Sequence, residues 1–180
     1  MSLDLASRYT ASYCEENIWH LCGDCAEAGI EAYAVFISNA DRAVAVWQQR
    51  ASRHPDAPVL WDYHVILIAR IDAHWRVYDP DSRLAAGQLV GEYVETSMPI
   101  LPPTLDRHAP RFRVVEASRY RARLATDRSH MREPDGGWRS PPPPFPTIGE
   151  GTNLMRFVDM QADFEGELMH RSQLLARFAE

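Results

Sequence analysis

The longest apolar run of the chain covers residues 61–70, with four consecutive aliphatic side chains at 65–68. An uninterrupted run of this kind is typical of a strand that is buried on both faces. Two shorter runs, at 33–38 and 43–47, are rich in Val, Ile and aromatic residues and also predict strands, with a turn at 39–42. We therefore expect a sheet with the strand at 61–70 near its centre.

A hairpin is expected at the end of this central strand, because a polar turn follows Ile71 and a second short strand follows the turn. If Ile71 pairs with His74, the register of the two strands places His64 opposite Asp81. Asp79 then lies two positions from Asp81, on the same face. A shift of one residue would move these side chains to opposite faces, so the register is a specific prediction.

Helical spacing of apolar residues occurs near both ends of the chain. A helix is expected to begin at Cys14 and to end near Gly29, because the apolar residues between them recur on one side. These residues are Ile18, Trp19, Leu21, Cys22 and Cys25. A last helix is expected at 171–178, and another is expected to begin within 119–124.

Two segments have neither a helical nor a strand-like pattern. Residues 98–110 are rich in proline and are expected to form a loop before a short strand at 111–115. Residues 127–148 contain two adjacent glycines and a proline run at 141–146. We expect this second segment to be ordered by docking on the body of the protein. The alternative is an exposed proline-rich ligand for an aromatic groove.

Length and charge narrow the class of protein. One domain is expected over residues 1–180, since a chain of this length buries a substantial core without disulfides or metals. The net charge of -6 argues against binding to nucleic acid, which requires clustered cations. The N-terminus lacks the basic and apolar regions of a secretory signal, and no apolar run is long enough to span a membrane. We therefore expect a cytoplasmic protein without membrane association.

The reactive residue types are limited, because all 19 Lys and Arg positions are arginine. The absence of lysine excludes Schiff-base chemistry, attachment of pyridoxal phosphate and the lysine of a phosphate-binding loop. Cys14, Cys22 and Cys25 lie close together, and their odd number favours reduced thiols. Cys22 and Cys25 have the spacing of half a zinc site, with His20 nearby, but no second cysteine pair completes it. We expect these two cysteines in the helix core, and no metal site.

Nucleophilic catalysis by a cysteine is the main chemistry left. Cys14 lies at the predicted start of a helix, where the helix dipole and free N–H groups stabilise a thiolate. The neighbouring Glu15 and Glu16 act in the opposite direction, because carboxylates raise the pKa of a nearby thiol. A thiol nucleophile also needs a base, and that base needs a third group to orient it. His64 and Asp79 are the candidates for these two roles.

Each of these residues also has a structural interpretation. Cys14 could be a small buried apolar residue. His64 could be a buried histidine whose ring bonds to a backbone carbonyl. Asp79 could be a turn residue before Pro80, and Asp81 competes with it for the orienting role. The residue pattern alone leaves these alternatives open.

Five blocks of the sequence form a recognisable series in chain order. They read Tyr-Cys-Glu-Glu-Asn-Ile-Trp (13–19), Tyr-Ala-Val-Phe-Ile-Ser-Asn (33–39), Trp-Asp-Tyr-His-Val (61–65), Asp-Arg-Ser-His-Met (127–131) and Pro-Pro-Pro-Pro-Phe-Pro (141–146). The series resembles the protein N-terminal glutamine amidohydrolase family, and its Trp-Asp-Tyr-His-Val block is distinctive. The resemblance covers most of the chain, but it is weak for the last helix, and Cys22 and Cys25 fall outside the family pattern.

The resemblance implies a fold similar to that of papain-like and transglutaminase-like cysteine enzymes. This is an α/β fold with a central, mostly antiparallel sheet and an N-terminal helix that carries the nucleophile. The family's catalytic triad falls on Cys14, His64 and Asp79, which favours Asp79 over Asp81. The resemblance also implies a monomer that requires no cofactor.

The implied activity converts the N-terminal glutamine of a protein or peptide to glutamate, with release of ammonia through a thioester on Cys14. In eukaryotes the family's product is a destabilising N-terminus, an N-degron intermediate. Recognition of a free α-ammonium group requires a carboxylate or several carbonyls. Glu15, Glu16 and Asp62 are candidates by their proximity to the catalytic blocks. The alternative for each is an ordinary charge at a helix start or a strand end.

Three other functions remain as alternatives. The first is a protein deamidase or transglutaminase-like enzyme that acts on internal glutamine. The second is a non-catalytic module that binds N-terminal residues, and the third is a papain-type peptidase. The family resemblance disfavours all three.

Overall fold

A six-stranded antiparallel sheet forms the centre of the computed structural model, which describes residues 3–179. Its strand order is β6-β5-β4-β1-β7-β8. The strands are β1 (Ala32–Ser38), β4 (His64–Ile71), β5 (His74–Tyr78), β6 (Gln88–Leu89), β7 (Arg111–Glu116) and β8 (Glu167–Met169). The apolar run of the sequence forms β4, which pairs with both β1 and β5, so its predicted central position is confirmed.

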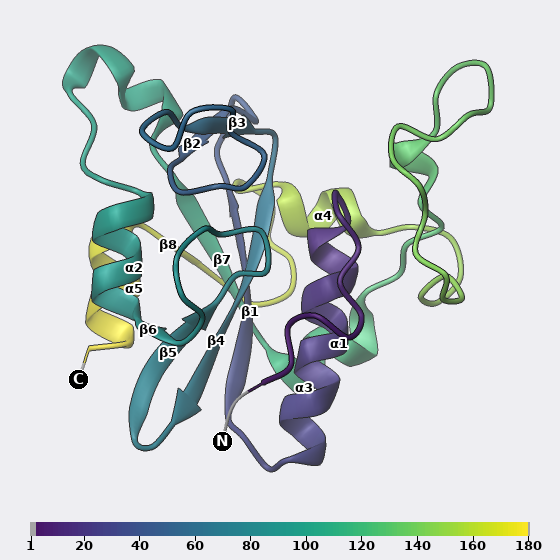
Figure 1. Ribbon diagram of the computed structural model, residues 1–180, viewed down its shortest axis with the longest axis horizontal. Helices are drawn as coiled ribbons and strands as arrows, with labels where there is room; N and C mark the ends of the chain where they lie inside the picture. The colour runs from purple at the N-terminus through teal and green to yellow at the C-terminus, as the bar shows by residue number, and fades with distance from the viewer. Residues whose placement is uncertain (1–2, 180) are drawn as a thin grey trace.

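Helices cover both faces of this sheet (Figure 1). α1 (Cys14–Glu27), α3 (Ala117–Arg123) and α4 (Leu154–Val158) lie on one side, and α2 (Val90–Ser97) and α5 (Arg171–Arg177) lie on the other. Alternate residues of β1 enter different cores: Phe36 packs on the α1 side, whereas Val35 and Ile37 pack on the α2 side. The prediction of an α/β fold with an N-terminal helix and a central antiparallel sheet is confirmed.

The hairpin of β4 and β5 has the predicted register, with Ile71 paired to His74. Asp72 and Ala73 form the two-residue turn, and both have positive φ angles, 51° and 69°, as a tight hairpin turn requires. The ladder runs as far as the pair of Leu67 and Tyr78. Beyond that pair, the start of β4 and the chain that follows β5 meet at one end of the sheet, where His64 and Asp79 lie.

The strand predicted at 61–70 is divided in the structure. β3 (Val59–Trp61) and β2 (Val44–Val46) form a separate two-stranded sheet, and β4 begins only at His64. The chain changes direction at Asp62, whose backbone carbonyl accepts a hydrogen bond from Ser38 Oγ at 2.6 Å. The Asp62 carboxylate in turn accepts the N–H of Tyr63 at 2.9 Å. The break in the strand thus lies immediately before the site histidine.

Some of the remaining helices and strands were predicted from the sequence, and others were not. The helices expected at 119–124 and 171–178 are α3 and α5, and the strand expected at 111–115 is β7. The proline-rich loop contains a 3-10 helix, η1 (Pro103–His108). The sequence analysis missed β6, α2, α4 and β8, all of which are short. Among residues 3–179, no helix is long and apolar enough to cross a membrane.

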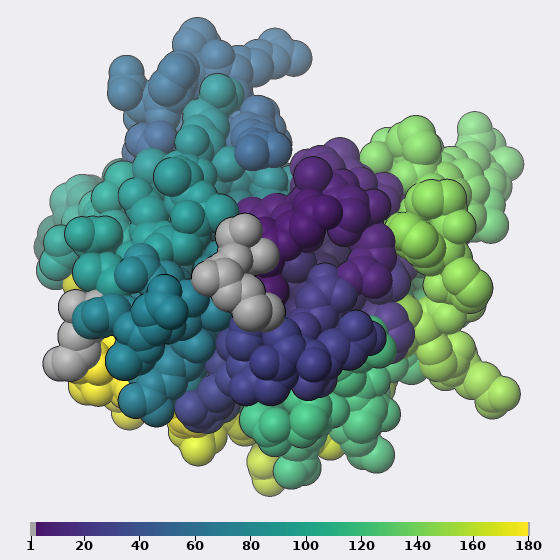
Figure 2. All heavy atoms as spheres, turned by 60° about the horizontal axis from the view of Figure 1, so that its bottom comes forward, coloured from purple at the N-terminus to yellow at the C-terminus, as the bar shows by residue number. Residues whose placement is uncertain are grey.

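The proline run docks on the body of the protein, as predicted. Arg128 anchors the segment: its guanidinium donates to both carboxylate oxygens of Glu16 at 2.7 and 2.8 Å. The same guanidinium donates to the carbonyls of Pro143, Phe145 and Pro146. In the space-filling view the green segment lies against the purple N-terminal region (Figure 2). The long segment between η2 (Ser129–Met131) and α4 is therefore held beside α1.

Candidate active site

Cys14 is the first residue of α1, and the loop before it is fixed by buried polar contacts. Asn17 clamps this loop, because its side chain accepts from the N–H of Thr10 and donates to the carbonyl of Thr10, both at 2.9 Å. Tyr13 is fully buried and donates its hydroxyl to the carbonyl of Ser140 at 3.0 Å. The thiol is thus presented from a helix start whose approach is anchored on two sides.

His64 is the first residue of β4, and its ring is held from two directions. Its Nε2 atom lies 2.9 Å from Oδ1 of Asp79, and both side chains are only 1% exposed. The Trp61 ring stacks on the imidazole with an interplanar angle of 14° and a centroid distance of 5.7 Å. Because Asp79 occupies Nε2, the Nδ1 atom is the one left for proton transfer.

Asp79 is held by a set of donors that the sequence analysis largely missed. Its Oδ2 atom accepts from Tyr93 at 2.7 Å and from Gln49 at 3.0 Å. Its Oδ1 atom accepts from the N–H of Asp81 at 3.0 Å as well as from His64. Tyr93 was detectable, since Val90, Tyr93, Val94 and Ser97 recur at helical spacing on α2. Gln49 had no such signal, because it reaches Asp79 only through the tertiary fold.

The pKa values of the triad reflect this environment. Burial alone would raise the pKa of Asp79, but the charge of His64 and the bonds from His64, Gln49 and Tyr93 lower it below its ordinary value. Burial alone would lower the pKa of His64, but the charge of Asp79 and its hydrogen bond raise it above the ordinary value. The geometry therefore favours an ionised Asp79 and an imidazole that holds its proton more tightly than usual.

The surroundings of Cys14 favour the neutral thiol over the thiolate. Its burial, followed by the negative charges of Glu15 and Asp81, raises the pKa of Cys14 well above its ordinary value, against a backbone hydrogen bond from Val65 that lowers it. The thiol donates weakly to Glu15 Oε2 at 3.8 Å. The opposing effect of Glu15 that the sequence suggested is therefore present. Glu16 is not among the main causes of this shift, and its carboxylate pairs with Arg128.

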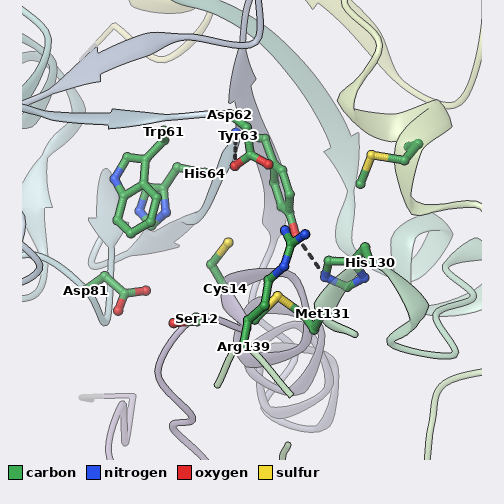
Figure 3. Close-up of a pocket in the computed structure, with 11 residues that line it drawn as sticks. Ser12, Cys14, Trp61, Asp62, Tyr63, His64, Asp81, His130, Met131 and Arg139 are labelled. Atoms are coloured by element: carbon green, nitrogen blue, oxygen red, sulfur yellow. Dashed lines mark hydrogen bonds between the residues drawn. The ribbon is translucent and has the colours of Figure 1, made fainter. Parts of the chain in front are cut away.

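A cavity of about 300 Å³ brings the predicted catalytic residues together. Figure 3 shows Cys14 and His64 facing it, with Trp61 beside the histidine. The lining residues are Ser12, Cys14, Trp61, Asp62, Tyr63, His64, Asp81, His130, Met131, Arg139 and Met155. Asp79 lies behind His64 and does not line the cavity. Residues from the N-terminal loop, β4 and the segment after Arg128 thus form a single pocket.

The three predicted substrate-binding carboxylates have different positions. Asp62 is exposed and lines the cavity. Glu15 is fully buried behind the cavity wall, where it accepts from the Tyr63 hydroxyl at 3.0 Å and lies 3.4 Å from Nε2 of His130. Glu16 is also buried, in its ion pair with Arg128. The structure therefore leaves Asp62 alone of the three in direct reach of a ligand.

His64, Asp79 and Asp81 also have the spacing of a metal site, since one ligand atom from each lies within 4.8 Å of the others. Nε2 of His64 and the carboxylate oxygens of Asp79 already form hydrogen bonds to each other, to Tyr93 and to Gln49, and a metal ion would have to replace these bonds. Cys22 and Cys25 are buried in the core on the α1 side, as predicted. The arrangement is thus better suited to proton transfer than to metal binding.

Comparison with known proteins adds a second line of evidence. The family model of the N-terminal glutamine amidase matches residues 9–178. The protein N-terminal glutamine amidohydrolase of Homo sapiens is 40% identical over 156 residues, which are 84% of this chain and 76% of the human protein. The proteins of the same name from Bos taurus and Drosophila mojavensis are both 38% identical, over 156 and 151 residues. These two alignments cover 84% and 81% of this chain, and 75% and 74% of the respective relatives. This chain therefore belongs to the N-terminal glutamine amidase family.

Proposed function

We propose that this protein is a hydrolase that converts an N-terminal glutamine to glutamate and releases ammonia, with Cys14 as nucleophile, His64 as general base and acid, and Asp79 as the group that orients His64. The family membership supports the reaction. One observation supports the roles of the residues: the thiol at the start of α1 and His64, whose ring is bonded to Asp79 behind it, line the same cavity. No step requires a cofactor.

In the first half of the reaction, His64 takes the thiol proton as the sulfur of Cys14 attacks the side-chain amide carbon. The high pKa of the thiol implies that this proton leaves during the attack and not before it. The carbon–nitrogen bond then breaks while His64 returns a proton to the departing nitrogen. Ammonia leaves, and the glutamyl side chain remains as a thioester on Cys14.

In the second half, water attacks the thioester while His64 takes one of its protons. The carbon–sulfur bond breaks, and the thiolate recovers its proton from His64. The net change is addition of water and loss of ammonia, which turns the side-chain amide into a carboxylic acid. Both tetrahedral intermediates carry an oxyanion, and the first-turn N–H of Cys14, which has no partner within its own helix, is suited to stabilise it.

The other cavity residues are suited to bind the remaining parts of an N-terminal glutamine, its methylene groups and its α-ammonium group. Trp61, Met131 and Met155 supply apolar surface for the glutamine methylenes. Asp62 is the carboxylate that we assign to the α-ammonium group, since it is exposed on the cavity wall. Glu15 acts indirectly, through Tyr63 and His130, and Glu16 holds Arg128 and the segment that Arg128 anchors.

We also propose the setting in which the enzyme acts. Residues 1–180 form one catalytic domain that works as a monomer in the cytoplasm. Its partners are proteins or peptides with a free N-terminal glutamine, and the product is an N-degron intermediate where an arginylation pathway exists. The negative charge of the chain supports an enzyme without a nucleic-acid partner.

The test uses a short peptide that begins with glutamine, together with its N-acetylated form and a form that begins with asparagine. We expect ammonia release and the mass gain of amide-to-acid conversion for the free glutamine peptide alone, and loss of both in Cys14→Ser. Turnover of the acetylated peptide would indicate an internal-glutamine deamidase. Binding without ammonia release would indicate a binding module, and cleaved peptide would indicate a peptidase.

A further inference from the structure

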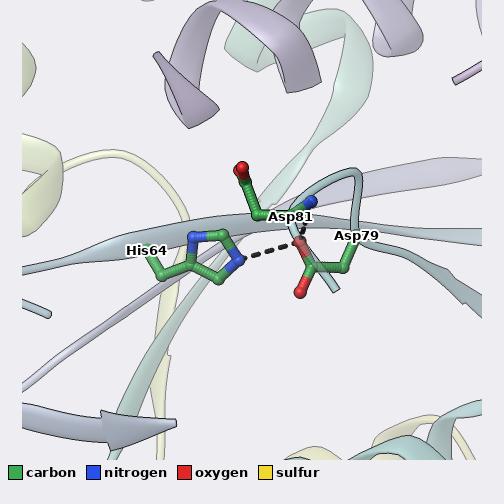
Figure 4. A group of neighbouring side chains, drawn as sticks. All are labelled: His64, Asp79 and Asp81. Carbon is green, nitrogen blue, oxygen red and sulfur yellow. Dashed lines mark hydrogen bonds and ion pairs between the residues drawn. The ribbon is translucent and has the colours of Figure 1, made fainter. Parts of the chain in front are cut away.

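Asp81 is a cavity residue for which the mechanism above has no role. It lines the pocket together with Cys14 and His64. One of its carboxylate oxygens lies within 4.8 Å of both a ring nitrogen of His64 and an oxygen of Asp79. Figure 4 shows the Asp81 carboxyl group turned away from Asp79, although its backbone N–H donates to Asp79. The structure therefore places a second carboxylate beside the general base, on the cavity side.

The position of Asp81 is fixed by two bonds. The Tyr9 hydroxyl donates to Oδ1 of Asp81 at 2.6 Å, and the N–H of Asp81 donates to Oδ1 of Asp79 at 3.0 Å. Within residues 3–179, no hydrogen-bond donor contacts the other carboxylate oxygen, Oδ2. One oxygen of Asp81 is thus anchored, and the other is available to a ligand in the cavity.

The geometry of deamidation offers a role for a hydrogen-bond acceptor at this place. When the amide oxygen points to the helix start, the amide nitrogen must face His64, which gives it a proton as it leaves. An amide –NH2 group has two N–H donors, whereas a carboxylate has none. A carboxylate beside His64 can therefore accept one of these N–H groups, and it would repel a carboxylate oxygen at the same place.

We propose that Asp81 is a specificity-determining residue, which accepts an N–H of the glutamine side-chain amide and repels the carboxylate of the glutamate product. The proposal rests on the proposed function. It adds the basis on which the enzyme distinguishes the glutamine side-chain amide from the glutamate carboxylate. The water oxygen that enters the product takes the place of the ammonia that left. The new negative charge therefore forms next to Asp81 and favours release of the product.

A carboxylate in this cavity could instead bind the α-ammonium group of the substrate. The role that we propose for Asp81 differs from that one in its effect on the product. A residue that binds the ammonium attracts substrate and product equally, because both carry it. A carboxylate that contacts the end of the substrate side chain attracts the glutamine amide and repels the glutamate carboxylate. Substitution of Asp81 and of Asp62 by asparagine removes the same charge from the same cavity, and the two variants form a matched pair.

The experiment measures kcat and KM for a glutamine peptide, and the inhibition constant of the same peptide with N-terminal glutamate. In Asp81→Asn, we expect kcat/KM to fall and the glutamate peptide to bind roughly tenfold more tightly, because the repulsion is removed. In Asp62→Asn, both peptides should bind more weakly. Unchanged or weaker inhibition by the glutamate peptide in Asp81→Asn, or equal tightening in both variants, would overturn the proposal.

A second measurement does not depend on how Asp81→Asn folds. In Cys14→Ser, which binds without turnover, the glutamine peptide should bind at least about tenfold more tightly than the glutamate peptide. Equal binding of the two peptides contradicts a repulsive Asp81. Failure of the proposed function is distinguishable from both results, because the unmodified protein would then release no ammonia from the glutamine peptide.

Discussion

Burial and the charges of three carboxylates, Glu15, Asp81 and Asp79, raise the pKa of the Cys14 thiol. Asp79 also raises the pKa of His64. A thiol with a high pKa is slow to react with adventitious electrophiles, because only the thiolate is nucleophilic. Reactivity then depends on a bound substrate and on a deprotonated His64. The ionisation of single residues can therefore be followed through the pH dependence of activity and the rate of thiol alkylation.

The pH dependence of activity should reveal the pairing of His64 with Asp79. A general base works when it is deprotonated, so kcat/KM should fall as pH decreases through the raised pKa of His64. In Asp79→Asn the pKa of His64 should fall, and the acidic limb of the profile should move to lower pH. The rate at the plateau should also drop, by roughly 10²–10⁴-fold.

The measurement is the profile of kcat/KM against pH for the glutamine peptide, in both proteins. The ordinary pKa of histidine, about 6.5, is the reference. An acidic limb that stays in place in Asp79→Asn would show that another group controls it. Asp62→Asn is the control, since Asp62 is on the cavity wall and its carboxylate accepts the N–H of Tyr63, whereas the ring of His64 bonds to Asp79.

Glu15→Gln should make Cys14 more reactive. The substitution removes the charge nearest in sequence to the thiol but keeps a group that can bond to Tyr63. We expect the pKa of Cys14 to fall and the rate of alkylation by iodoacetamide at neutral pH to rise roughly tenfold, because a larger share of the thiol is then ionised. Cys14→Ser identifies the labelled position, since Cys22 and Cys25 are buried.

Glu16→Gln is the matched control for this experiment. Glu16 is adjacent and also buried, but its carboxylate pairs with Arg128 and it is not among the main causes of the raised pKa of Cys14. Alkylation should therefore be little changed in Glu16→Gln. Equal acceleration in the two variants would indicate loosening of the helix start and not an electrostatic effect.

At the scale of elements, the site depends on one hairpin that was predictable and one helix that was not predicted. The register of β4 and β5 followed from alternation and turn length, and it correctly placed His64 near Asp79. α2 was missed, although Val90, Tyr93 and Val94 have helical spacing. Eight residues are too few for a strong periodic signal, and α2 is stabilised mainly by packing on the sheet.

Tyr93→Phe tests the link between α2 and the triad. The aromatic ring, which packs in the core, is retained, and only the hydroxyl that donates to Asp79 is lost. We expect a loss of about 1–3 kcal/mol in the free energy of unfolding, because a buried carboxylate oxygen loses a donor. kcat should fall modestly, since Gln49 and His64 still hold Asp79.

Urea denaturation gives the free energy of unfolding, and steady-state kinetics give kcat. Tyr120→Phe is a suitable comparison, because Tyr120 is equally buried but donates to the backbone carbonyl of Glu15 and not to the triad. A fall in kcat of the same size in both variants would argue that α2 has no particular connection with the chemistry.

At the scale of the whole molecule, one wall of the cavity comes from a segment with little regular structure. His130, Met131 and Arg139 line the pocket, and all three lie within the eleven residues that follow Arg128. Docking of this segment was predictable, since a long irregular stretch inside a domain needs tertiary contacts. Its anchor was not, because a sequence shows no pairing between Arg128 and Glu16, which are 112 positions apart.

Arg128→Met tests whether this anchor maintains the cavity. The change leaves Glu16 buried without its partner, and breaking a buried pair costs about 3–5 kcal/mol. If the segment loosens before the sheet unfolds, KM should rise more than kcat falls, because the proposed catalytic triad lies on α1, on β4 and in the turn after β5. Limited proteolysis should then cleave within 132–139, where the chain is exposed.

The double variant Glu16→Gln with Arg128→Met separates charge from packing. It removes the uncompensated carboxylate, so part of the lost stability should return, whereas contacts to the carbonyls of the proline run stay absent.

Arg132→Met is the comparison for an exposed arginine of the same segment. The Arg132 guanidinium lies over the Trp138 ring, and its loss should have little effect on KM. If Arg128→Met and Arg132→Met have the same KM and the same protease resistance, the anchor does not shape the cavity, and the position of His130 must depend on its contacts with Tyr63 and Glu15 instead.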